Sequence, residues 1–371
     1  MNIQCSKRLA GLGLTIFTLL AALFALEIML GVDSIRQKLG LPQPGRWEWL
    51  SKGYHRIDSE LIYSMKPEYN GQWEEPAFTV KVSTNSLGLR GREIGPKVDG
   101  VKRIIVVGDS MVFGWGASDD ETFPRRLEDL LNTSGKQFEV VNAGVQGYGT
   151  DQSYTLYTKR LAHLEPDILV FCLFENDVDN NIGMSLYSIK DGTLIPLAVD
   201  NHPVYILGRL QEALPAFIKK MTTYRIFSTI FANKLPYDRL PDLDMDALKA
   251  WSKRKVNLQI ADLQEQASRK GFHLLVVGLP YNVGKYTDAG FYTFVEGHGD
   301  VAQKLFDMSR LPVWQEEEQA LFMAGRDPHT NLSGYQLIAE LLAEYIRTYS
   351  ADQTVTNSTP RRIREAGNSD H

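Results

Sequence analysis

The feature that most constrains this chain is a short apolar run that ends abruptly in Gly-Asp-Ser. Residues 103–107 read Arg-Ile-Ile-Val-Val, and Gly108, Asp109 and Ser110 follow directly. Further glycines and a helical pattern come next, so the segment predicts a strand, a tight turn and a helix. Ser110 is therefore expected at the carboxyl end of a strand, where open α/β sheets bind ligands. There its hydroxyl can act as a nucleophile, although a plain tight turn would give the same tripeptide.

A second polar motif stands far downstream. Asp327 and His329 are two residues apart and directly precede a strongly amphipathic segment. In a turning segment this spacing lets the carboxylate reach Nδ1 of the imidazole, which leaves Nε2 to accept a proton from a serine. Alone, the pair is read more simply as polar loop residues ahead of a helix. Together with Ser110, it favours a serine nucleophile with a histidine base.

Two more motifs follow apolar runs that predict strands. The run 138–141 leads into a glycine-rich loop that contains Gly144, and the run 167–174 leads directly to Glu175 and Asn176. With the N–H of Ser110, the Gly144 N–H and the Asn176 amide can converge on one oxygen and form an oxyanion hole. A turn glycine and a strand-end cap are the simpler alternatives for these two residues.

Taken together, these motifs resemble a known family. Ser110, Gly144, Asn176 and His329, in this order and each after a predicted strand or before the last helix, resemble the four blocks of the SGNH/GDSL hydrolase superfamily. The resemblance implies that Ser110 is the nucleophile and His329 the base, with Asp327 orienting the histidine. It further implies that Gly144 and Asn176 complete the oxyanion hole of an ester-hydrolysing enzyme.

The resemblance covers about residues 101–349, with two departures. The third block of the family usually reads Gly-x-Asn-Asp, whereas residues 174–177 read Phe-Glu-Asn-Asp. Glu175 therefore enters the neighbourhood of the site and offers a rival base. The last block, 327–329, is Asp-x-His rather than the commoner Asp-x-x-His, a variant associated with membrane-anchored and polysaccharide-related members. Neither departure removes a catalytic atom.

The fold class follows from the alternation of strand and helix patterns in this region. Parallel sheets need helices on both faces, so we expect an α/β, three-layer α/β/α sandwich with a mostly parallel sheet. The residues Ser-Asp-Asp-Glu at 118–121 resemble a capping box that would open a helix ending at Leu131. Further helices are predicted over 151–164, over 244–270 and from Leu332 onward, and a further strand over 272–279.

The N-terminus carries a separate signal. Residues 9–26 form an uninterrupted uncharged apolar stretch, preceded by Lys7 and Arg8. A run of this length can span a bilayer, and the basic residues favour a cytoplasmic N-terminus. A cleaved signal peptide is the main rival, but the apolar run is long and no clear Ala-x-Ala site follows it. A buried core helix is a third alternative, disfavoured because the run is apolar on all sides.

The expected organisation has four parts. They are a cytoplasmic stub and transmembrane anchor over 1–32, a β-rich accessory segment over 33–100, a catalytic domain over 101–349, and a disordered tail over 350–371. An insertion at about 180–243 interrupts the catalytic domain and does not match its pattern. It is equally compatible with a lid over the site, with a packing elaboration and with helices that lie on the membrane surface.

Composition excludes several other classes of function. The 371 residues carry a formal net charge of −5, so nucleic acid is not an expected partner. Arg90 and Arg92 can bind an anionic group, but the simpler expectation is that they are surface charges. Cys5 and Cys172 lie on either side of the predicted anchor and cannot pair, and Cys172 is expected in the core. The histidine spacing predicts no metal site, and no cofactor is implied.

These expectations combine into one primary function and two alternatives. The primary one is a membrane-anchored serine esterase that hydrolyses small acyl esters, O-acetyl above all, on envelope or exported glycans. It would be a single-pass inner-membrane protein with its catalytic domain on the periplasmic or extracellular side. The first alternative is an O-acyltransferase that uses the same acyl-enzyme. The second is a catalytically silent scaffold or glycan-binding protein. Protein partners are not predicted.

Overall fold

The computed structural model separates the chain into two compact units. The first consists of residues 1–57 and 200–236, and the second of residues 58–199 and 237–371. The predicted domain boundaries stay a prediction, and the predicted tail lies outside the described residues from position 352 onward. The residues that the structure describes are 3–41, 53–75, 77–135, 137–234, 240–282, 291–295, 305–324 and 327–351.

The second unit is built on a five-stranded parallel sheet. Its strands, in spatial order, are β11 (Phe306–Asp307), β10 (His273–Gly278), β7 (Ile168–Leu173), β5 (Lys102–Gly108) and β6 (Phe138–Gly144). The apolar residues 104–107 of β5 are completely buried, as expected for a central strand with helices on both faces.

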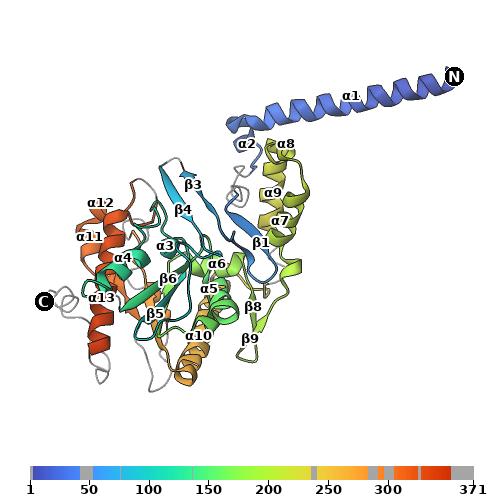
Figure 1. Ribbon diagram of the computed structural model, residues 1–371. Coiled ribbons are helices and arrows are strands. Elements are labelled where there is room, and N and C mark those ends of the chain that lie inside the picture. The colour runs from blue at the N-terminus through green and yellow to red at the C-terminus, as the bar shows by residue number, and fades with distance from the viewer. Residues whose placement is uncertain are drawn as a thin grey trace. The chain divides into compact units, whose positions relative to one another are not determined.

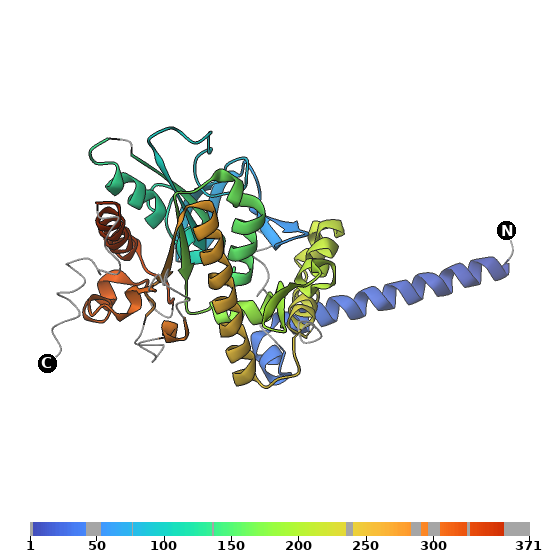
Figure 2. The same cartoon turned by 90° about the horizontal axis from the view of Figure 1, so that it is seen from below.

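Helices cover both faces of this sheet. Figures 1 and 2 show α4 (Phe123–Leu131) and α13 (Leu332–Ala351) together on one face, and α5 (Thr150–Leu156) and α10 (Met245–Lys270) on the other. The predicted three-layer α/β/α sandwich is therefore confirmed. The other elements of this unit are β2 (Ile62–Met65), β3 (Asn70–Glu75), β4 (Phe78–Ser83), α3 (Ser110–Phe113), α6 (Asp177–Gly183), β8 (Tyr187–Lys190), β9 (Thr193–Pro196), α11 (Val313–Glu316) and α12 (Glu318–Leu321).

The strand order defines where a ligand can bind. The chain moves from β5 outward to β6 on one side and then crosses to β7 on the other side of β5, so the direction of winding reverses at β5. Open α/β sheets bind ligands beside such a reversal, at the carboxyl ends of the strands. Gly108 pairs with Gly144, and both end their strands. The segments that follow β5, β6 and β7 therefore emerge at one edge of the sheet.

Two predicted helices differ from the observed ones. The helix expected from residue 118 begins at Phe123, because Thr122 caps it and Pro124 occupies its first turn. Only one half of the expected capping box forms, a hydrogen bond from Ser118 N–H to Glu121 Oε2. The stretch 151–164 is helical, but it changes after α5 into a π-helical and then a 3₁₀ segment.

The first unit contains the apolar N-terminal helix. The long helix α1 (Ile3–Gly31) is followed by α2 (Asp33–Lys38), and the part of the insertion in this unit forms α7 (Pro203–Ala213), α8 (Ala216–Lys219) and α9 (Thr222–Lys234). The chain passes into the second unit within β1 (His55–Asp58). Within α1, the window Leu14–Gly31 is long and apolar enough to cross a membrane. Only 6% of this window is buried inside the protein.

Candidate active site

The turn after β5 places Ser110 at the start of a helix. Asp109 caps α3 by accepting a hydrogen bond from the Met111 N–H at 2.9 Å, and Ser110 is the first residue of the helix. Gly114 ends α3 with a φ of +98°, a conformation that favours glycine. The Ser110 N–H makes no hydrogen bond within the described part of the chain and lies at the carboxyl edge of the sheet.

Ser110, His329 and Asp327 form one chain of hydrogen bonds. The Ser110 Oγ lies 2.8 Å from His329 Nε2, and His329 Nδ1 lies 2.5 Å from Asp327 Oδ1. Because the Asp327 carboxylate accepts at Nδ1, the neutral ring presents Nε2 as an acceptor toward the serine. The structure thus brings together the three side chains that the sequence singled out, in the order that the proposed chemistry requires.

The Asp327 carboxylate receives two further hydrogen bonds. The indole N–H of Trp115 donates to Oδ2 at 2.9 Å, and the backbone N–H of His329 donates to Oδ1 at 3.0 Å. Burial raises the pKa of Asp327, but these donors and the His329 ring outweigh it, so the pKa lies below its ordinary value. The group is therefore ionised at neutral pH and can stabilise a charged imidazole.

Trp115 also fixes the plane of the histidine ring. Its ring stacks on His329 with 4.8 Å between centroids and 15° between planes, and Phe174 stacks on His329 at 5.9 Å. Trp115 is not among the residues that the sequence motifs single out. The signal that was available is its position between Gly114 and Gly116, one turn after the serine.

Gly144, predicted as an oxyanion donor, lies where β6 approaches α3. Its N–H donates to Asn142 Oδ1 at 3.0 Å, so this donor is already engaged inside the protein. A Cβ at this position would lie 2.2 Å from the Phe113 N atom, which is backbone of α3. Gly144 therefore permits the end of β6 to pack directly against the helix that carries Ser110.

A second glycine of the same loop has a free donor. Gly147 is half-exposed with a φ of +71°, and its N–H makes no hydrogen bond among the described residues. The neighbouring backbone is held from the side, because Tyr63 donates its hydroxyl hydrogen to the Gln146 carbonyl at 2.9 Å. Tyr148 donates in turn to the Tyr63 carbonyl at 2.7 Å. This loop is thus fixed while one N–H stays available at the edge of the sheet.

Asn176 follows β7 and lies just before α6. Its Oδ1 is buried and has no hydrogen-bond partner within the described residues. The start of α6 is held by α10, because Ser252 Oγ donates to the Val178 carbonyl at 2.9 Å and Lys255 Nζ contacts the Asn181 carbonyl, one turn later, at 3.1 Å. Asn176 therefore belongs to a rigid element at the same edge of the sheet as Ser110.

Two buried carboxyl groups lie behind the serine. Burial raises the pKa of Asp109, and hydrogen bonds from Met111, Ser110 and Asn176 offset only part of this rise. Burial together with the charge of Asp109 raises the pKa of Asp177 well above its ordinary value. Asp177 also accepts the Phe174 N–H at 2.7 Å. Two carboxylates in one apolar region repel each other, so the Asp177 carboxyl favours its neutral form.

We predict a pH-dependent gain in stability for Asp177→Asn. A folded-state pKa above the unfolded value gives stability that is complete below the ordinary aspartate range and is lost as pH rises through the folded pKa. The amide stays neutral and keeps an acceptor for the Phe174 N–H, so the melting temperature of the variant should exceed that of the wild type by a margin that grows with pH. Thermal unfolding from pH 5 to 9 measures this margin. The control is Asp179→Asn on the exposed side of α6, and a uniform loss in Asp177→Asn would contradict the argument.

Among the hydrogen bonds of the described residues, none joins Glu175 to Ser110. Burial raises the pKa of Glu175, with further contributions from Asp179 and Asp109. The described hydrogen bonds of the Ser110 hydroxyl go to His329 Nε2 and, at 3.3 Å, to Asp109 Oδ2. The geometry therefore favours His329 over Glu175 as the base.

Arg90 holds the segment after the serine in place. The residue is 4% exposed, and its guanidinium donates to the carbonyl oxygens of Phe113 at 2.7 Å, Gly114 at 3.0 Å and Ala117 at 2.5 Å. It also pairs with Asp119 Oδ1 at 3.0 Å. The expectation that Arg90 is a surface charge was wrong, because these carbonyls need a buried multiple donor. The same ion pair gives Asp119 a structural role in holding Arg90.

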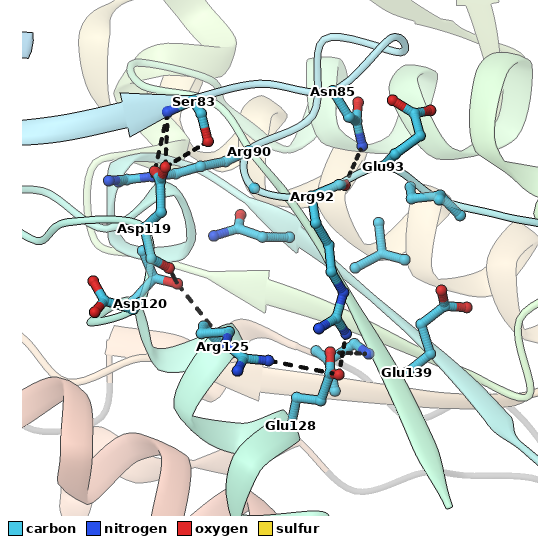
Figure 3. Close-up of a pocket in the computed structure, with 16 residues that line it drawn as sticks. Ser83, Asn85, Arg90, Arg92, Glu93, Asp119, Asp120, Arg125, Glu128 and Glu139 are labelled. Atoms are coloured by element: carbon cyan, nitrogen blue, oxygen red, sulfur yellow. Dashed lines mark hydrogen bonds and ion pairs between the residues drawn. The ribbon is translucent and has the colours of Figure 1, made fainter. Parts of the chain in front are cut away.

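A polar pocket of about 380 Å³ lies beside Arg90 and does not include Ser110, Asp327 or His329. Figure 3 shows that the three arginines of its lining pair with acidic side chains: Arg90 meets Asp119, and Arg92 and Arg125 both meet Glu128. These charges therefore satisfy each other and do not point to a bound anion. No cluster of possible metal ligands occurs among the described residues.

The sequence and the fold are similar to those of known proteins. Residues 106–337 match the GDSL-like Lipase/Acylhydrolase family, whereas no curated protein is significantly similar to the sequence. Similar solved structures include a two-domain esterase active on acetylated mannans, of 11% identity and TM-score 0.39, covering 70% of this chain and 53% of that chain. A catalytic mutant of an acetylxylan esterase from Geobacillus stearothermophilus has 11% identity and TM-score 0.36, covering 70% and 100%. A lipase/acylhydrolase from Enterococcus faecalis has 13% identity and TM-score 0.37, covering 67% and 96%. The chain thus spans about half the length of the first of these structures.

Proposed function

The chain belongs to the GDSL-like lipase/acylhydrolase family and is a serine hydrolase of ester bonds, and we propose that it is anchored in a membrane and removes small acyl groups, O-acetyl above all, from envelope or exported glycans. The observation that carries the enzymatic part is the chain of hydrogen bonds from Ser110 through His329 to Asp327 at the point where the sheet reverses its winding. The glycan part depends on the proposed location, where esterified envelope polymers are within reach.

The proposed reaction begins with attack on the ester. Ser110 Oγ forms a bond to the acyl carbon while its proton passes to His329 Nε2, and the Asp327 carboxylate stabilises the imidazolium. The same proton then passes to the leaving alcohol, which departs and leaves an acyl-serine. Water attacks this acyl group and gives a proton to His329. The bond between the acyl carbon and Ser110 Oγ then breaks, His329 returns the proton to Oγ, and the acid leaves.

We assign the oxyanion hole to three donors. They are the N–H of Ser110, the side-chain amide of Asn176, and the N–H of Gly147 in place of that of Gly144. Each follows one of three adjacent strands, so all three donors project from one edge of the sheet. Fixed N–H donors of this kind stabilise the negative charge that develops on the carbonyl oxygen in the transition state.

The test of the enzymatic proposal is covalent labelling of the full-length protein in membranes. A fluorophosphonate probe reacts with an activated serine, so peptide mapping should find the adduct on Ser110. The adduct should be absent from Ser110→Ala and greatly reduced in His329→Ala. Labelling that persists in Ser110→Ala, or a wild type that does not react, would rule out the proposed nucleophile.

The proposed topology has its own test. Lys7 and Arg8 precede the apolar helix, and basic flanks remain on the cytoplasmic side. A reporter fused after residue 371 is therefore expected to be active in the periplasm or outside the cell. A matched control is the double variant Lys7→Glu with Arg8→Glu, in which a smaller fraction of the reporter should reach the periplasm or the exterior. A cytoplasmic reporter in the wild type would contradict the orientation.

A further inference from the structure

Within the first unit, one carboxylate connects the apolar helix to the insertion. Glu27 is the single acidic residue of the window Leu14–Gly31. Its side chain accepts the backbone N–H of Thr222, and at 2.9 Å it accepts both the N–H and the hydroxyl of Thr223. These groups form the first turn of α9, whose N-terminus carries a partial positive charge. The carboxylate thus receives three hydrogen bonds from the insertion.

The position of Glu27 along α1 sets the depth at which its carboxylate would lie in a bilayer. The helix rises about 1.5 Å per residue, so Glu27 lies roughly 27 Å beyond Leu9, close to the roughly 30 Å thickness of a bilayer's hydrocarbon core. A carboxylate at that boundary needs polar partners. If α1 crosses a membrane, the first turn of α9 therefore lies at the outer boundary of the hydrocarbon, and α8 immediately precedes it. Figure 1 shows α8 and α9 beside the C-terminal end of α1.

The helices at that depth expose apolar side chains. Phe217 of α8 is 68% exposed, and Phe227 of α9 is 55% exposed and stacks on Phe231 one turn later. Ile206 and Leu210, four residues apart on one face of α7, are also exposed. Exposed apolar residues that recur on three adjacent helices mark an interaction surface rather than isolated surface residues.

The charge of the same helices complements an anionic surface. Residues 203–234 carry five basic residues against the single acidic Glu212, a net charge of +4 in a chain of net charge −5; the five are Arg209, Lys219, Lys220, Arg225 and Lys234. Lys219 and Lys220 directly follow the exposed Phe217 and its neighbour. Long basic side chains next to apolar ones suit the boundary between acyl chains and anionic headgroups.

We propose that α7, α8 and α9 form a membrane-docking platform that lies in the headgroup region of the bilayer, at the depth that Glu27 sets. The platform inserts Phe217 and its apolar neighbours among the acyl chains, while the basic side chains contact anionic headgroups. This inference depends on the anchoring that we propose above. It gives the insertion a binding role at the lipid surface, separate from the chemistry at Ser110.

The test is the depth of spin labels in full-length protein reconstituted in phosphatidylglycerol and phosphatidylethanolamine vesicles. In a Cys5→Ser background, nitroxides are attached at Phe217→Cys, at Leu20→Cys within α1, and at Leu87→Cys, an exposed apolar residue of the catalytic unit. Cys172 is buried and should not react. Relaxation by oxygen, which dissolves in lipid, is compared with relaxation by a water-soluble nickel chelate.

We expect the Leu20 label deep in the bilayer, the Phe217 label near the headgroup boundary with oxygen favoured over nickel, and the Leu87 label in water. Lys219→Glu with Lys220→Glu should move the Phe217 label toward water. A Phe217 label in water while the Leu20 label is in lipid would overturn the platform. A Phe217 label hidden from both reagents, with spin–spin broadening, would overturn it in favour of a second copy of the chain.

The outcomes separate this inference from the proposals on which it depends. A Leu20 label in water would show that the anchoring itself is wrong. Fluorophosphonate labelling of Ser110 in the same vesicles reports the enzymatic proposal independently, because Ser110 belongs to the other unit. The variant Glu27→Ala tests whether Glu27 sets the depth of the Phe217 label. It should leave the Leu20 label in place while the Phe217 label loses its defined depth, and an unchanged Phe217 label would overturn the role of Glu27.

Discussion

Asp327→Asn is expected to lower kcat for a small test ester by about 10⁴-fold, with the fold retained. Three N–H groups converge on this carboxylate, from the Trp115 indole, the His329 ring and the His329 backbone. An asparagine offers one acceptor oxygen and one NH₂ group. Whichever way the side chain is turned, its NH₂ group faces an N–H donor from which it cannot accept a hydrogen bond. Such a side chain can neither hold the required tautomer nor stabilise the imidazolium.

The structure provides a second variant that tests this explanation. In Trp115→Phe with Asp327→Asn, the NH₂ group can turn to the place that the indole N–H occupied, while the oxygen faces His329 Nδ1. The double variant should therefore recover part of the activity that Asp327→Asn loses, although Trp115→Phe alone lowers kcat. Steady-state kinetics of the four proteins gives the coupling. A double variant with strictly additive losses would contradict the role given to Trp115.

Asn176→Ala is expected to cost roughly 2.7 to 4 kcal/mol of transition-state stabilisation, about 10²- to 10³-fold in kcat, with KM little changed. The reason is that its amide is assigned to the oxygen that becomes negative only during the reaction. The matched control is Asn180→Ala, one turn later on α6, whose amide donates to the Tyr148 carbonyl at 3.1 Å. The control variant should lower the melting temperature while its kcat stays close to that of the wild type. A kcat for Asn176→Ala close to that of the wild type would remove Asn176 from the oxyanion hole.

The parts of the fold that sequence predicted are those with a strong local pattern. The strand that ends at Gly108 is apolar on both faces, and the helix from Leu332 has a clear helical period, so neither depended on knowing its neighbours. Helix beginnings are less certain because signals compete. The residues at 118–121 match a capping box, yet Thr122 followed by Pro124 supplies a stronger start for the same helix.

The parts of the site that sequence could not predict depend on contacts between distant segments. The loop after β6 has several glycines, and the choice between Gly144 and Gly147 as a donor rests on where the Asn142 side chain points. Trp115 and Arg90 act on residues far away in sequence, so no local period marks them. The partner of the insertion is equally hidden, because amphipathic helices show which face is apolar but not what covers it.

The contacts of Arg90 bear on how this enzyme can be divided and re-used. A fragment trimmed to the matched region, residues 106–337, would keep Ser110 and His329 but would remove the guanidinium that binds the carbonyls behind the nucleophile. Grafting the strand–turn–helix onto another scaffold would meet the same deficit unless a comparable donor came with it. The portable catalytic module of this chain is thus larger than the motif by which it is recognised.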